Sequence, residues 1–107
     1  MLDAATLTAI LDSFGDPVVF ADADHTIRYM NPAGIAKYGE GLVGTDVLAC
    51  HDDRSRAEML EIWEAMQQGA EQRMIAQNEK RRVYMRAVRD RDGRLLGYYE
   101  WYTGPAD

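Results

Sequence analysis

The segments with strand-forming composition occur in adjacent runs at both ends of the chain. Residues 17–21 and 26–30 are rich in β-branched, apolar or aromatic side chains, and only a short turn-forming segment separates them. Three further strand candidates follow one another near the end: residues 72–76, 82–89 and 95–103. Asp92-Gly93 is typical of a tight hairpin turn between the last two. Strands joined by short connections pair antiparallel, so the sequence predicts an antiparallel sheet of five strands.

Two longer segments carry apolar side chains at helical spacing. In residues 2–14 the apolar face of the predicted helix consists of Leu7, Ile10, Leu11 and Phe14. In residues 54–68 the apolar face consists of Met59, Ile62, Trp63 and Met66. Pro17 cannot continue the first helix, and Gly69 is a favourable residue to end the second. The sequence therefore places an amphipathic helix at each of these positions.

A third, shorter helix is expected over residues 33–38. It follows Asn31-Pro32, in which the asparagine side chain accepts from a free amide and the proline has a helical φ already set. Glycines at 39, 41 and 44 then favour a loop with at most a single helical turn. The complete order of helices and strands predicts an α+β fold with helices packed on one face of the sheet.

Length and charge restrict the classes of function. At 107 residues the chain fits one domain, which we divide into an N-terminal helix (1–14), a core (17–103) and a tail (104–107). The 18 acidic side chains outnumber the 12 basic ones, which opposes binding to phosphate backbones. We therefore expect neither a nucleic acid nor a membrane surface as a partner.

Cysteine and histidine are scarce. A single cysteine excludes an internal disulfide, and two histidines leave little material for a metal cluster, so we expect no metal site. No apolar run approaches the length of a membrane span, and the start of the chain lacks the positive flank of a signal peptide. These features predict a cytoplasmic protein.

Three segments resemble the PAS domain, a sensory module with a five-stranded antiparallel sheet. DPVVFADADHTIRYMNPAG (16–34) resembles its first hairpin and following helix, GLVGTDV (41–47) its glycine-marked connector, and RAVRDRDGRLLGYYEWYT (86–103) its last two strands. A narrower similarity is to the PAS-like modules found beside hemerythrin-type domains, on Cys50-His51, VYMRAVRDRDG (83–93) and Glu100. The resemblance implies a pocket for a small molecule between helices and sheet, and a signal relayed to an output domain or partner protein.

Cys50-His51 is the one pair of adjacent residues with soft or imidazole ligands. The histidine could be an axial haem ligand and the cysteine a reactive thiol, or the pair could be a buried cysteine beside a loop histidine. We expect no haem, but if haem binds, His51 rather than His25 is its ligand. We also expect no flavin, because Cys50 does not lie in the motif of the flavin-binding members. His25, in the first turn with Asp22 and Asp24, is assigned no function.

Several adaptable apolar side chains could line the pocket or simply form the core. They are Tyr29, Met59, Trp63, Met66 and Met85. Arg86 and Glu100 add charges within neighbouring strands; if they share a face, they form either a surface ion pair or a polar pair inside the pocket. The candidate ligand-binding residues are thus Tyr29, Cys50, His51, Met59, Trp63, Met66, Met85, Arg86 and Glu100.

The function predicted from these features is a sensory domain that binds a small organic ligand and is not an enzyme. No nucleophile has a base nearby in sequence, and no glycine-rich phosphate loop is present. One alternative is a haem-based sensor. Another is an interaction module without ligand that forms a homodimer through the first helix, whose apolar face needs cover: Leu7, Ile10, Leu11 and Phe14.

Overall fold

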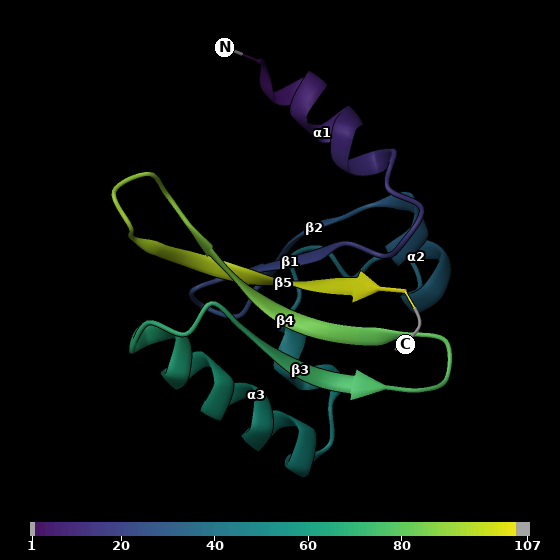
Figure 1. The fold of residues 1–107 in the computed structure, drawn as a ribbon. Helices are drawn as coiled ribbons and strands as arrows, with labels where there is room; N and C mark the ends of the chain where they lie inside the picture. Colours follow the sequence, from purple (N-terminus) through teal and green to yellow (C-terminus); the bar gives the residue numbers. More distant parts are fainter. Residues whose placement is uncertain (1, 105–107) are drawn as a thin grey trace.

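The computed structural model describes residues 2–104 and contains the predicted five-stranded antiparallel sheet. The strands are β1 (Val19–Asp22), β2 (Ile27–Met30), β3 (Gln72–Gln77), β4 (Arg82–Arg89) and β5 (Leu95–Thr103). They lie side by side in the order β2-β1-β5-β4-β3, so the first and last strands of the chain pair at the centre of the sheet (Figure 1). The α+β prediction is confirmed. Most of the predicted tail, residues 105–107, lies outside the described residues.

Four helical segments connect or precede the strands. They are α1 (Ala4–Asp12), α2 (Pro32–Tyr38), the 3-10 turn η1 (Val47–Cys50) and α3 (Asp53–Gln67). Each begins after an Asp or Asn whose side chain accepts a hydrogen bond from a backbone N–H of the first turn: Asp3, Asn31, Asp46 and Asp52. No helix in residues 2–104 is long and apolar enough to cross a membrane.

The inner face of the sheet carries the core. One cluster of buried side chains joins α3 to three strands: Ala21, Ile62, Met66, Met85 and Tyr98. A second cluster lies beside α2: Val19, Ile27 and Met30. Figure 1 shows α3 along one side of the sheet and α1 extending away from it. In agreement with this position, α1 contributes no buried residue.

The side chain of Asn31 forms hydrogen bonds both with the segment between α1 and β1 and with the start of α2. Its side chain is fully buried, and its Oδ1 accepts hydrogen bonds from the N–H groups of Gly34 and Val18, each at 2.8 Å. Its Nδ2 donates to the carbonyl oxygens of Asp16 at 2.9 Å and Phe14 at 3.3 Å. The predicted cap is therefore confirmed, and the same side chain also fixes the path by which the chain enters the sheet.

Candidate functional site

Two adjoining cavities lie on the inner face of the sheet. The α3 cavity has a volume of about 210 Å³ and reaches Met59 on α3, Ile75 on β3 and Met85 on β4. The α2 cavity has a volume of about 250 Å³, and its walls include Tyr38 on α2 and the loop residue Leu42. Four residues line both: Val19, Val47, His51 and Glu100. Two polar side chains, one histidine and one glutamate, therefore stand where two mainly apolar cavities meet.

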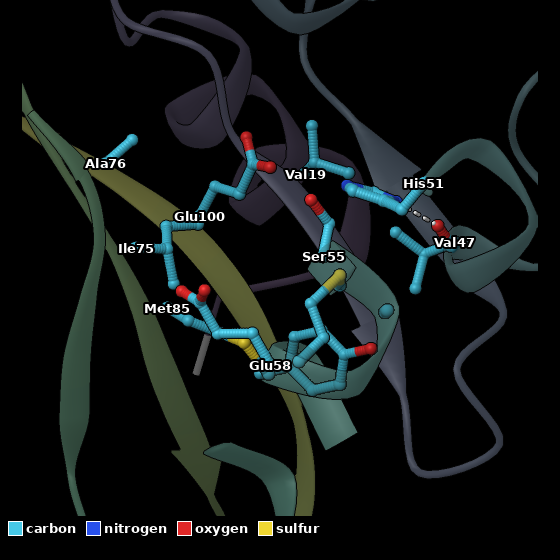
Figure 2. A pocket seen from close by; sticks show the side chains of 12 residues that line it. Val19, Val47, His51, Ser55, Glu58, Ile75, Ala76, Met85 and Glu100 are labelled. Carbon is cyan, nitrogen blue, oxygen red and sulfur yellow. Dashed lines mark hydrogen bonds between the residues drawn. The ribbon is translucent and has the colours of Figure 1, made fainter. Parts of the chain in front are cut away.

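His51 follows η1 directly, and its ring is held by the turn that precedes it. Nδ1 lies 2.8 Å from the carbonyl oxygen of Val47. Because a carbonyl oxygen only accepts, Nδ1 carries the hydrogen, and Nε2 of the neutral ring is left as an acceptor. Figure 2 shows the ring extending toward Val19 and Ser55, into the α3 cavity. The candidate site thus includes an oriented imidazole.

Glu100 lies on β5, and its carboxylate is held by two tyrosines. Oε2 accepts hydrogen bonds from the hydroxyl of Tyr38 at 2.7 Å and that of Tyr102 at 3.5 Å. Burial, followed by the negative charge of Glu100, raises the pKa of Tyr38, so this hydroxyl stays protonated as a donor. Within residues 2–104, Glu100 forms no ion pair, and Oε1 accepts no hydrogen bond.

Of the predicted binding residues, His51, Met59, Met85 and Glu100 line the α3 cavity. Met66 lies wholly in the core and lines neither cavity. Trp63 also lines neither, but its ring packs against Tyr98, which does line the α3 cavity. Cys50 belongs to η1, and its side chain lies outside the described part of the structure.

Arg86 and Glu100 do not share a face of the sheet, so the pair that the sequence predicted for a shared face does not form. In the β4–β5 register Glu100 lies opposite Met85, and Arg86, one residue further, projects to the other side. There its guanidinium donates to Oε1 of Gln72 at 2.7 Å and stacks on the Trp101 ring, 5.1 Å from its centroid. The structure therefore places Arg86 away from both cavities.

Tyr29 likewise faces the outer side of the sheet. Its hydroxyl donates to the Asp12 carboxylate at the end of α1. It lines a third, apolar hollow with Leu11 and Phe14 rather than either inner cavity. Tyr29 therefore connects α1 to β2.

His25, to which the sequence assigns no function, lies in a turn and packs against other side chains. It has a positive φ of 63°, and its half-buried ring packs edge-on against Trp63 with 5.4 Å between centroids. Its Nδ1 lies 2.8 Å from the hydroxyl of Tyr98. The hint in the sequence was a histidine in a tight turn, since this residue type tolerates positive φ. This cluster supports one wall of the α3 cavity through Tyr98.

Metal ligands do not gather in the described part of the chain. Among the side chains described for residues 2–104, which do not include that of Cys50, no three of His, Asp or Glu are grouped so that they could hold a metal ion. What the site offers chemically is hydrogen-bond acceptors, tyrosine hydroxyls and apolar surface.

Comparisons with known proteins agree on the fold. A family model described as PAS domain matches residues 7–104. No curated protein matches the sequence significantly. A solved C-terminal domain from Streptococcus mutans is similar, with a TM-score of 0.81 and 24% identity over 96% of this chain and 85% of that one.

Two further solved structures show the same fold at lower identity. The PAS domain of Bordetella pertussis BvgS has a TM-score of 0.63 at 14% identity, over 96% of this chain and 86% of that one. An RNA-binding light-oxygen-voltage receptor has a TM-score of 0.62 at 19% identity. That match covers 97% of this chain but 34% of the receptor chain. At these identities the similarity establishes the arrangement of strands and helices alone.

Proposed function

The chain belongs to the PAS domain family, a family of sensory and signalling modules, and on this premise we propose that it binds a small molecule in the two joined cavities and relays occupancy to a partner domain. The observation that carries the proposal is the junction of the cavities, where His51 and Glu100 line both. A few placed polar groups in an otherwise apolar concavity are typical of small-molecule sites. The ligand would lie between α3, α2 and the inner face of the sheet.

The relay is supported by a contact that crosses the site. The Tyr38–Glu100 hydrogen bond joins α2 to β5, and Glu100 also lines both cavities. A ligand that contacts Glu100 would therefore change how firmly α2 is held to the sheet. We propose binding rather than catalysis, because Ser55, which also lines the α3 cavity, forms no hydrogen bond with His51 within the described residues.

Methyl NMR combined with a small-molecule fragment screen tests this function. Binding fragments should shift the methyl signals of Val19, Met59 and Met85, while those of Met74, which is 45% exposed and lines neither cavity, stay unchanged. Substituting Val47→Phe, which adds bulk where the cavities meet, should abolish the shifts, with circular dichroism to verify the fold. If no fragment perturbs the lining methyl groups, the proposed binding function is wrong.

A cytoplasmic location is part of the same proposal. It is supported by the single cysteine, which cannot form an internal disulfide of the kind that oxidising compartments favour. Fractionation of cells that express the protein tests this location.

A second candidate function, dimerisation, is favoured by the exposed apolar face of α1. Leu7, Ile10, Leu11 and Phe14 are 37% to 49% exposed. Leu11 and Phe14 also border an apolar hollow of about 410 Å³ on the outer side of the sheet, with Phe20, Val88 and Tyr99. We propose that the α1 face of a second copy covers this hollow, since apolar surface of this kind is typical of interfaces.

Sedimentation of the double variant Leu11→Asp, Phe14→Asp tests the dimer. The variant should be monomeric at concentrations where the unmodified protein is dimeric. The control is Thr8→Asp, an exposed position on α1 outside the apolar set, which should remain dimeric. A monomeric unmodified protein, or a double variant that still dimerises, contradicts this interface.

A further inference from the structure

The polarity of the joined cavities defines the class of ligand. We propose that they bind a small organic cation, a protonated amine carried on a compact apolar body. The inference rests on the proposed function, because it specifies the ligand of the same site. Three observations support this inference: the polar atoms that line the cavities, the absence of basic residues among their described lining, and their volumes.

The two polar side chains at the junction both present acceptors. The Nδ1–H of His51 is used by the Val47 carbonyl, which leaves Nε2 of the neutral ring to accept. Glu100 receives its hydrogen bonds on Oε2 from Tyr38 and Tyr102, which leaves Oε1 to accept. A ligand group that contacts both residues must therefore donate hydrogen bonds. An ammonium group has three N–H donors and a charge opposite to that of the carboxylate.

Basic side chains are missing from the cavity walls. Neither cavity has Lys or Arg among its described lining residues, whereas Glu58 and Glu100 both line the α3 cavity. The Lys37 ammonium lies 4.7 Å from the centroid of the Tyr102 ring and makes no ion pair with Glu100 in residues 2–104. An anionic ligand would therefore lose its hydration beside like charges with no cation to compensate it.

The other residues that line the cavities are mainly apolar, and together with the small volumes they favour a small apolar group on the ligand. Met59, Ile75 and Met85 line one cavity, and Ile27, Met30 and Leu42 line the other. Each cavity taken singly, at about 210 or 250 Å³, lies below the roughly 300 Å³ at which pockets for drug-sized ligands begin, so a ligand group held in one of them must be small. A short branched alkyl group or a single aromatic ring has the size that such a cavity holds. Methionine side chains adapt to either shape.

Three probes that differ mainly in their polar group test the inference: benzylamine, benzyl alcohol and benzoate. Calorimetry or methyl NMR at neutral pH should show that benzylamine binds, with benzyl alcohol at least about tenfold weaker, because only the ammonium group carries a charge opposite to that of the Glu100 carboxylate. Benzoate should not bind. Benzylamine should shift the methyl signals of Val19 and Val47, which line both cavities.

Two matched variants separate the role of Glu100 from that of overall charge. Glu100→Gln keeps an acceptor for the Tyr38 hydroxyl and should weaken benzylamine binding about tenfold or more, and benzyl alcohol binding by a clearly smaller factor, because only benzylamine loses an attraction between opposite charges. Glu61→Gln removes the same charge from the exposed side of α3 and should leave both affinities unchanged. Equal losses in the two variants would show that benzylamine responds only to overall charge, which overturns the inference.

The remaining outcomes distinguish this inference from the function on which it rests. If benzyl alcohol or benzoate binds as tightly as benzylamine at the same methyl groups, the cavities bind ligands but do not select cations. The proposed function would then stand, and the inference would be wrong. If none of the three probes binds and the fragment screen also leaves the lining methyl groups unchanged, both are wrong. If other fragments bind there but benzylamine does not, the inference alone is wrong.

Discussion

The Tyr38 hydroxyl donates a 2.7 Å hydrogen bond to Glu100, and this bond joins the last residue of α2 to a β5 residue that lies 62 positions later in the chain. The same hydroxyl also shares a hydrogen bond with Tyr102 on β5. Because these contacts close one side of the α2 cavity, they hold the wall of the site as well as the carboxylate.

Tyr38→Phe should lower the free energy of unfolding by about 1 kcal/mol, since a hydrogen bond to a charged group is lost from a partly exposed position. Urea denaturation followed by circular dichroism measures this change. The matched control is Tyr84→Phe on β4, whose hydroxyl forms no hydrogen bond within residues 2–104. An equal loss in the two variants would show that the Tyr38–Glu100 contact adds nothing to stability.

Asn31→Ala should be more damaging, with a loss of about 2 kcal/mol or more. Two buried N–H groups, those of Val18 and Gly34, would lose their acceptor together. Asn31→Asp keeps that acceptor but cannot donate to the carbonyl oxygens of Asp16 and Phe14, so its loss should be intermediate. Equal stability of the two variants would mean that the hydrogen bonds donated by Nδ2 to Asp16 and Phe14 contribute all of the effect.

Met66→Ala tests whether Met66 is a core residue or a residue that lines a cavity. Because Met66 is fully buried and lines neither cavity, the substitution should cost about 2 to 5 kcal/mol. Met74→Ala, at a side chain that is 45% exposed, should change the stability by less than about 0.5 kcal/mol. Thermal unfolding measures both changes. A loss below about 1 kcal/mol at Met66 would contradict its assignment to the core.

These residues show how far the sequence alone leads. The spacing of apolar residues and the Asn31 cap specify the helices, and strand segments that follow one another closely specify antiparallel pairing. For these reasons the fold could be predicted from the sequence. Strand register could not be predicted in the same way. A shift of one residue exchanges the two faces of a strand, and for this reason the sequence left open whether Arg86 and Glu100 share a face, which they do not.

The candidate binding site could be predicted only in part, because its geometry also depends on contacts between distant segments. The residue types at Cys50-His51 and Glu100 indicate a binding site. The sequence does not show which polar atoms of these side chains already form hydrogen bonds within the protein. The carbonyl of Val47 fixes the ring of His51, and Tyr38 holds Glu100 from a distant helix. The contacts of His25 could not be predicted from the sequence, because its partners, Trp63 and Tyr98, come from segments far along the chain.

Alkaline pH should destabilise the protein. In the unfolded chain tyrosines lose their protons near pH 10, whereas burial raises the pKa of folded Tyr98, and the charges of Asp46 and Asp22 raise it further. Above pH 10 the unfolded state then binds fewer protons, so Tyr98 contributes a decline of up to about 1.4 kcal/mol per pH unit. Denaturation between pH 8 and 11 should show a shallower decline for Tyr98→Phe; an unchanged slope would exclude Tyr98 as a cause.

Addition of hemin should produce no sharp Soret band. His51 is the histidine that lines the cavities, since His25 is engaged with Tyr98. Yet the Nε2 of His51 faces cavities of about 210 and 250 Å³ that adjoin the Glu100 carboxylate, and volumes below roughly 300 Å³ are small even for a drug-sized ligand. A porphyrin would have to displace α3 or α2 from the sheet, which would expose the core around Met66 and Met85. A Soret band that is lost in His51→Ala but retained in His25→Ala would reverse this prediction, because it would show that the cavities open far enough for iron to reach His51.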